Sequence, residues 1–255
     1  MRRKVEKTRL VLVHGFPLDS SMWAAQKKHF GKKFKVFCPD LPGFGRSEKR
    51  APKTMEGFAR GVKAYFAEEK IDRAIIAGFS MGGYVVQAFY EMFPKNVEGL
   101  ILVDTRTAAD SAEGKAGRDK AIRSLDEEGV AFFADTMPRR LLSETGNRED
   151  KLVKEVRKII MKQKSESVKN ALIAMRDRKD RSALLPRVDV PTLLVCGEED
   201  SFTPSEEMIE MANLVKGCSF SMIKRAGHLS NMENPADFNL ALEDFLNGSE
   251  RRKNE

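Results

Sequence analysis

The sequence has no long hydrophobic run. Its 255 residues are 41% hydrophobic, but no stretch approaches the roughly 18 consecutive apolar residues of a membrane-spanning helix. We therefore expect no membrane segment. The apolar run LVLV at 10–13 is also too short for the core of a secretory signal, and the charged residues before it include Glu6. With no export signal visible, a cytoplasmic location is predicted.

Cysteine and histidine are scarce, with three of each. Cys38, Cys196 and Cys218 each lie in or beside an apolar run, and their spacing does not resemble that of a metal site. Buried, reduced thiols are the expected state of such residues. The sequence therefore predicts no metal centre. Any function that needs an imidazole has only three histidine side chains from which to take it.

A continuous basic block is also missing, although the net charge is +7 and 33% of the residues are charged. Acidic and basic residues alternate in most segments, and no basic run is interleaved with aromatic residues. Both features argue against nucleic acid as a partner. The charge is better explained by a hydrated surface rich in ion pairs.

Six short apolar or β-branched runs alternate with helical patterns. The runs are LVLVH (10–14), KVFCP (35–39), RAIIAGF (73–79), GLILVD (99–104), TLLVCG (192–197) and CSFSMI (218–223), and the helical patterns fall near 21–30, 54–69, 82–93, 204–215 and 235–247. Unbroken apolar strands are typical of a parallel sheet covered on both faces. The alternation predicts a doubly wound α/β sheet, and the length fits one large core.

The alternation stops between 106 and 186. This interval has three or four helical patterns and no convincing strand, and it carries 19 Lys and Arg against 14 Asp and Glu. One pattern, EDKLVKEVRKIIMKQK, places its apolar residues on a single helix face. We predict a core formed by 1–105 and 187–255, with 106–186 as a helical insertion that holds most of the basic excess.

The stretch GFSMG places Ser80 between Gly78 and Gly82, after a strand-like run and before a helical one. A turn of one residue would force Ser80 toward a positive φ, and side chains at 78 and 82 would then collide. The pattern is that of a nucleophile elbow, G-x-S-x-G, which presents the hydroxyl at the sheet edge and at a helix N-terminus. A plain strand-to-helix turn is the alternative interpretation.

A serine hydroxyl needs a base to become nucleophilic. His29 lies in the Lys-rich pattern AAQKKHF and has the character of an exposed helix residue, while His14 precedes Gly15 and is better suited to shape a loop. His228, in KRAGHLSN after the last strand, can reach over the same sheet edge. We predict His228 as the base.

The base in turn needs an acid that holds its tautomer. Asp200 follows the strand TLLVCG and is favoured, whereas Asp104 follows the strand GLILV and is the rival, with Glu198 and Glu199 behind both. The alternative for Asp104 is a helix cap or an ion pair with Arg106.

An oxyanion formed during acyl transfer needs preorganised N–H donors. The amide of Met81, directly after the candidate nucleophile, supplies one. The loop HGFP supplies the other, and because Pro17 has no N–H, Phe16 is the predicted donor.

Five motifs in order resemble the α/β-hydrolase superfamily over nearly the whole length. They are HGFPLDSSMW (14–23), DLPGFGRS (40–47), GFSMGG (78–83), GEED (197–200) and AGHLSNMENP (226–235). The resemblance implies that Ser80, Asp200 and His228 form a triad, that Phe16 and Met81 form the oxyanion hole, and that 106–186 caps the pocket. Among the branches, the motifs are most similar to 3-oxoadipate enol-lactonases and small carboxylesterases, and the elbow also resembles that of cofactor-free haloperoxidases.

The sequence departs from this family at its start. Family members usually carry a β-hairpin before the strand that ends in His-Gly, but here Leu10 already begins that strand. The expected sheet therefore has about six strands, in the order 4-3-5-6-7-8 of the family's strand naming.

The predicted activity is hydrolysis of a small ester or lactone through an acyl-enzyme, with no metal or cofactor. Serine at the elbow argues against chemistry that needs a carboxylate nucleophile. Alternatives are a C–C bond hydrolase or perhydrolase with the same triad, or a ligand-sensing protein of this fold.

The pocket wall is expected to include seven residues that could equally belong to the core: Phe16, Trp23, Phe79, Met81, Phe132, Phe133 and Met137. Arg106, Arg139 and Arg140 could bind an acidic substrate or simply be hydrated surface residues.

Overall fold

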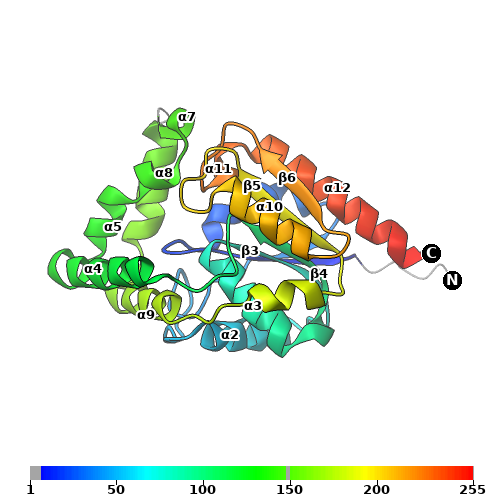
Figure 1. Ribbon diagram of the computed structural model, residues 1–255, viewed down its shortest axis with the longest axis horizontal. Coiled ribbons are helices and arrows are strands. Elements are labelled where there is room, and N and C mark those ends of the chain that lie inside the picture. Colours follow the sequence, from blue (N-terminus) through cyan, green and yellow to red (C-terminus); the bar gives the residue numbers. More distant parts are fainter. Residues whose placement is uncertain (1–6, 148–149, 255) are drawn as a thin grey trace.

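The computed structural model describes residues 7–147 and 150–254 and shows one six-stranded parallel sheet (Figure 1). Its strands are β1 (Arg9–Val13), β2 (Lys35–Phe37), β3 (Ala74–Phe79), β4 (Val97–Val103), β5 (Thr192–Gly197) and β6 (Ser219–Ile223). Their order is β2-β1-β3-β4-β5-β6, which is the order predicted from the family resemblance. All five pairings are parallel, so every strand ends at the same edge.

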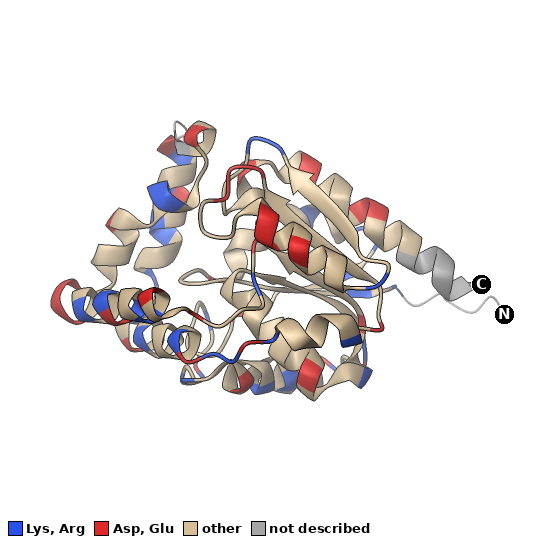
Figure 2. Ribbon diagram, in the orientation of Figure 1, with Lys and Arg blue, Asp and Glu red and all other residues tan. Residues whose placement is uncertain are grey.

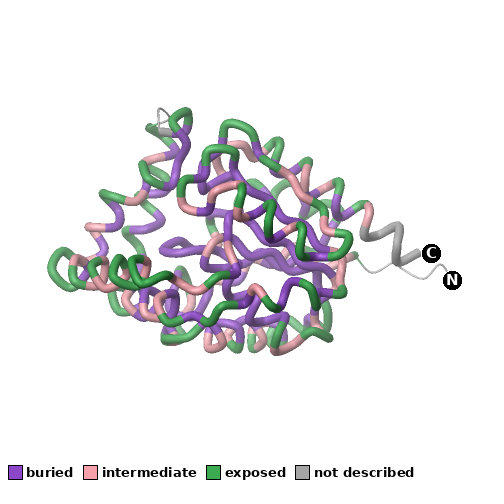
Figure 3. Tube along the Cα trace, in the orientation of Figure 1, coloured by how far each residue is buried: buried purple, intermediate pink, exposed green. Residues whose placement is uncertain are grey.

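The apolar character of the runs explains this arrangement. Strands β3 and β5 are buried at every position because helices cover both faces of the sheet (Figure 3). The edge strands differ: β2 has only three residues, and β6 is buried only at its last residue. Short or polar edges are a usual defence against pairing with other chains.

The core helices start close to where the sequence places them. They are η1 (Ser20–Trp23), α1 (Ala24–Phe30), α2 (Met55–Glu68), α3 (Met81–Met92), η2 (Pro94–Asn96), α10 (Ser205–Leu214), α11 (Ser230–Glu233) and α12 (Pro235–Asn254). Thr54 caps α2 by accepting a hydrogen bond of 3.0 Å from the Gly57 amide. Helix α2 packs on α3, and α1 packs against α12. Helix α12 continues past the predicted end at 247.

The interval between β4 and β5 contains helices and no strand. It holds α4 (Ala112–Glu128), α5 (Val130–Thr136), α6 (Pro138–Leu141), α7 (Glu144–Asn147), α8 (Asp150–Met161), α9 (Ser165–Arg176) and η3 (Ser182–Arg187). Figure 1 shows α4 to α9 together at the end of the molecule where the strands finish, opposite the two termini. The predicted insertion 106–186 has more helices than the three or four expected, and η3 extends across its predicted end.

The predicted amphipathic pattern becomes α8. Leu152, Val156, Ile159 and Ile160 are buried, and the helix packs against α5. Its opposite face carries several Lys and Arg residues (Figure 2). Across the described ranges, none of the helices combines the length and the apolar character that a membrane span requires. The cytoplasmic location stays a prediction.

The turn between β3 and α3 has the backbone that its glycines indicate. Ser80 has φ 50° and ψ −116°, and its own amide donates to the Val103 carbonyl at 2.9 Å. A Cβ at Gly78 would lie 2.3 Å from the Gly82 carbonyl oxygen, and a Cβ at Gly82 would lie 2.5 Å from the Val13 carbonyl oxygen. Because these neighbours are backbone atoms, only glycine fits on either side of Ser80.

We predict that Gly82→Ala lowers the free energy of unfolding by about 1–3 kcal/mol, because the new methyl group collides with the backbone of β1. Denaturant unfolding measures the change. Gly248→Ala is the matched control: a Cβ there meets nothing within 4 Å, and replacing a helical glycine should stabilise the protein by up to about 1 kcal/mol. Equal stability of the Gly82→Ala variant and the parent would contradict this account of the turn.

Candidate functional site

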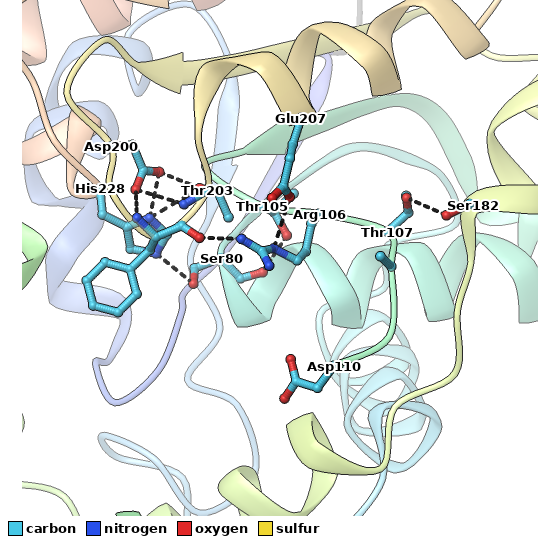
Figure 4. Close-up of polar contacts among 12 residues, drawn as sticks. Ser80, Thr105, Arg106, Thr107, Asp110, Ser182, Asp200, Thr203, Glu207 and His228 are labelled. Atoms are coloured by element: carbon cyan, nitrogen blue, oxygen red, sulfur yellow. Dashed lines mark hydrogen bonds and ion pairs between the residues drawn. The ribbon is translucent and has the colours of Figure 1, made fainter. Parts of the chain in front are cut away.

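A serine and a histidine meet at the carboxyl edge of the sheet. Ser80, half-buried at the start of α3, has its Oγ 2.9 Å from Nε2 of His228 (Figure 4). His228 lies on the loop between β6 and α11 and is 4% exposed. Its ring packs between Phe79 and Phe202, with centroid distances of 5.0 and 5.2 Å. These aromatic contacts fix the imidazole plane toward Ser80.

The other imidazole nitrogen contacts Asp200. Nδ1 of His228 lies 2.7 Å from Oδ2 of Asp200, on the loop after β5. Oδ1 of Asp200 accepts hydrogen bonds from the amides of Phe202 (2.8 Å) and Thr203 (3.0 Å), and Oδ2 accepts one from the Thr203 hydroxyl. Burial pushes the pKa of Asp200 upward, but the nearby His228 and these hydrogen bonds outweigh it, so the pKa is lowered. Asp200 is therefore an anion that holds the Nδ1–H tautomer of His228.

Asp104, the rival acid, is turned toward other partners. It follows β4 with φ 45°, is fully buried, and accepts hydrogen bonds from the Gly197 amide (2.7 Å) and the Ser230 hydroxyl. Burial, and then the charge of Asp200, raise its pKa well above the ordinary value. Two neighbouring buried carboxyls thus have opposite shifts, and the one that contacts His228 is the charged one.

The remaining candidate acids and bases lie elsewhere. His14 accepts from the Leu41 amide at Nε2 (2.9 Å) and contacts the Gly15 carbonyl through Nδ1, and burial lowers its pKa. His29 lies near Glu243 with 43% of its side chain exposed. Glu198 accepts from the Arg225 amide and Glu199 from the Glu144 amide. Of the three histidines, only His228 is hydrogen-bonded to Ser80.

Two backbone amides border the serine. Met81 is the first residue of α3, so its N–H belongs to the unsatisfied first turn of a helix. Phe16 follows His14 and Gly15 after β1 and lies with Ser80 on the wall of one cavity. In the part of the chain that the structure describes, neither the Phe16 amide nor the Met81 amide has a hydrogen-bond acceptor. Both N–H groups are therefore unsatisfied within the described part of the chain.

This cavity has a volume of about 540 Å³ and lies between the sheet edge and the insertion. Phe16, Phe132, Phe133 and Met137, which the sequence predicts for the pocket wall, line this cavity. The sequence did not indicate other wall residues: Tyr84, Arg118, Lys120, Leu172, Met175, Phe202 and Thr203. Tyr84 could have been found, because it lies four residues after Ser80 and therefore on the same helix face.

Trp23, Phe79 and Met81 do not line the cavity, and their predicted place on its wall was wrong. All three are buried. The Trp23 ring packs between Phe79 and Phe238, at 6.5 and 6.1 Å, within the core. Phe79 belongs to a strand that is buried at every position, and it supports the His228 ring from below. A large aromatic side chain gains free energy by burying its surface, so these residues pack in the core where buried neighbours are available.

The described residues, 7–147 and 150–254, contain no group of three His, Cys, Asp or Glu side chains placed to hold a metal ion. The three cysteines are free, and burial raises the pKa of Cys196 to about 12. A thiol with this pKa stays protonated and is a poor nucleophile.

Several known proteins share this architecture. A malate-bound thermophilic esterase from Thermogutta terrifontis is 36% identical, with a TM-score of 0.92 over 96% of this chain and 91% of its own. The enol-lactonase of Burkholderia xenovorans LB400 is 26% identical, with a TM-score of 0.87 over 96% of this chain and 93% of its own.

A curated relative shows a similar level of likeness. A pimeloyl-[acyl-carrier protein] methyl ester esterase from Salmonella agona is 26% identical over 241 residues, covering 91% of either chain. The sequence pattern of the alpha/beta hydrolase family matches residues 10–241. The fold, the strand order and this match agree, and the chain belongs to the alpha/beta hydrolase family.

Proposed function

We propose that this protein is a serine hydrolase that cleaves small carboxylic esters or lactones through an acyl-enzyme. The observation that carries the proposal is the hydrogen-bonded chain from Ser80 Oγ to His228 and on to a charged Asp200, at the wall of a cavity of about 540 Å³. A buried, ordered chain of this kind supplies nucleophile, base and orienting acid.

In the first half-reaction, Ser80 Oγ attacks the carbonyl carbon while His228 Nε2 takes its proton. The carbonyl oxygen becomes an oxyanion, which the Phe16 and Met81 amides stabilise together with the N-terminus of α3. His228 then returns the proton to the leaving alkoxide, and the carbon–oxygen bond breaks. Asp200 stabilises the imidazolium formed between these steps.

In the second half-reaction, water attacks the acyl-Ser80 carbonyl with His228 again accepting a proton. The tetrahedral intermediate collapses, the carboxylic acid leaves, and the Ser80 hydroxyl is restored. We further propose that the insertion acts as a cap over the pocket, since Phe132, Phe133 and Met137 come from α5 and its C-terminus and face the same cavity as Ser80. The esterase and lactonase relatives support an ester or lactone as substrate.

Ser80→Ala should abolish turnover, because no other group in the site replaces the attacking oxygen; losses of about 10⁶ in kcat are typical. We would measure hydrolysis of short p-nitrophenyl esters and labelling by a fluorophosphonate probe. Ser165→Ala, at an exposed position on α9, is the matched control and should retain both. Activity above a few per cent in purified Ser80→Ala protein contradicts the proposed nucleophile.

Asp200→Asn should reduce kcat by about 10⁴, because an amide cannot hold the Nδ1–H tautomer. Asp104→Asn should stay within about tenfold of the parent, since its carboxyl contacts Gly197 and Ser230 but not His228. The same ester assay compares the two variants. If the larger loss occurs in Asp104→Asn, the acids have been assigned in the wrong order.

The two carboxyls should also shape stability in opposite ways. Asp104, with a raised pKa, keeps its proton in the folded state after the unfolded chain loses its own near pH 4, so its contribution to the free energy of unfolding falls as pH rises above about 4. Asp200, with a lowered pKa, contributes stability that is present above about pH 4 and is lost as pH falls.

Denaturant unfolding at pH 4, 6 and 8 tests this difference. Relative to the parent, Asp104→Asn should gain stability toward pH 8, whereas the loss of stability in Asp200→Asn should stay nearly constant over this range and shrink only below about pH 4. Parallel stability profiles for the parent and Asp104→Asn would show that Asp104 is an ordinary carboxylate.

A further inference from the structure

The cavity beside Ser80 is lined by more cations than anions. Four of its wall residues are basic, namely Arg106, Arg118, Lys120 and Arg140, and one is acidic, Asp110. An apolar ester would need none of these charges. Their placement on the cavity wall raises the question of what they bind.

Two of the four cations already have partners. Nε of Arg106 lies 3.3 Å from a Glu207 oxygen, and its guanidinium also donates to the Phe202 carbonyl (Figure 4). Nε of Arg118 lies 3.1 Å from Asp110. These contacts pair Arg106 and Arg118 with carboxylates of the protein itself.

The carboxylate of Asp110 already has a second arginine partner, so it does not neutralise another cation of the wall. It also accepts a hydrogen bond of 2.6 Å from Nη1 of Arg178, whose side chain is 1% exposed. Arg178 in turn lies over the Tyr84 ring, with its Cζ 4.2 Å from the centroid. Among the described residues of the wall, the single carboxylate is therefore shared between two arginines, and this part of the cavity keeps a net positive charge.

Arg140 and Lys120 are the cations that remain. Among the residues the structure describes, neither has a carboxylate within 4.0 Å. Arg140 lies over the Phe202 ring, with its Cζ 5.3 Å from the centroid, and the same ring packs on His228 at 5.2 Å. The ring positions a guanidinium close to the reacting end of the pocket, and Lys120 extends the positive wall along α4.

We propose that the pocket selects esters or lactones that carry a second, free carboxylate, and that Arg140 binds this carboxylate with help from Lys120. The proposal rests on the serine hydrolase function above and narrows its substrate class to half-esters of small dicarboxylic acids and their lactone equivalents. A guanidinium fits a carboxylate with two parallel, charge-assisted hydrogen bonds. Neutral esters would leave this cation without a partner.

The test compares matched substrates. Monomethyl esters of C4 to C7 dicarboxylic acids are assayed by pH-stat against the corresponding dimethyl esters, which have the same chain but no charge. The parent should prefer the monoesters in kcat/KM by about 10- to 100-fold, mainly through KM. Raising the salt from 0.05 to 0.5 M should reduce this preference, because the side chains of both cations reach solvent.

Substitutions of Arg140 and Lys120 test which residue causes the preference for monoesters. Arg140→Gln should remove most of it by raising KM for the monoesters, and Lys120→Gln should remove a smaller part. In both variants the loss in kcat/KM on the dimethyl esters should be much smaller than the loss on the monoesters. Arg139→Gln is the matched control, because Arg139 is the neighbouring residue on α6 but is not part of the cavity wall. Glutarate should inhibit the parent competitively and the Arg140→Gln variant much more weakly.

Failure of this proposal can be told apart from failure of the enzyme assignment. Ser80-dependent hydrolysis of dimethyl esters with no preference for monoesters overturns the carboxylate selection alone. Equal losses on both substrates in Arg140→Gln also overturn it, because they indicate a structural role. Absence of Ser80-dependent hydrolysis of every ester overturns the proposed function itself.

Discussion

The site depends on one backbone constraint, the left-handed conformation of Ser80 between β3 and α3. When a strand passes into a helix through a single residue, the side chain of that residue points away from the sheet. A φ of 50° at a non-glycine residue such as Ser80 is energetically costly. Neighbours offset this cost. The Ser80 amide donates to Val103, and its carbonyl accepts from Thr105 Oγ1 at 2.8 Å and from the Gly83 amide at 2.8 Å. The sheet therefore fixes the hydroxyl before any substrate binds.

The site also depends on the different hydrogen-bond partners of two buried carboxyl groups, Asp104 and Asp200. Asp104 and Asp200 follow neighbouring strands and both are buried, yet only Asp200 receives two amides, a hydroxyl and an imidazole. The charge therefore stays where it can stabilise an imidazolium, while the neighbouring carboxyl favours its neutral form. Such separation of pKa values between adjacent acids is a recurrent feature of active sites.

The insertion contributes contacts as well as a wall. Glu233, at the end of α11, accepts from the Gly227 amide at 2.9 Å and from the Ser143 amide at 2.7 Å, so one carboxylate ties the His228 loop to the segment between α6 and α7. The Leu229 amide donates to the Leu141 carbonyl in the same region. These hydrogen bonds connect the insertion directly to the loop that carries His228.

By itself the sequence determined the parallel sheet and the turn at Ser80, because these follow from local features: unbroken apolar runs, glycines beside a serine, and helix start signals. The strand order was implied by the family resemblance and not by these local features. The sequence also narrowed the candidate base to His228, since only three histidines exist. What it left open required distances between separate segments. Asp200 and Asp104 follow similar strands, and only the hydrogen bond to His228 distinguishes them.

Trp23 and Phe79 are large aromatic residues of the kind that often line a pocket. In the structure Trp23 packs against Phe238 and Phe79 packs against His228, and both are buried in the core. The free cations of the wall were equally hidden, because whether Arg140 or Arg139 faces the cavity depends on how α6 packs, and adjacent residues on a helix point in different directions.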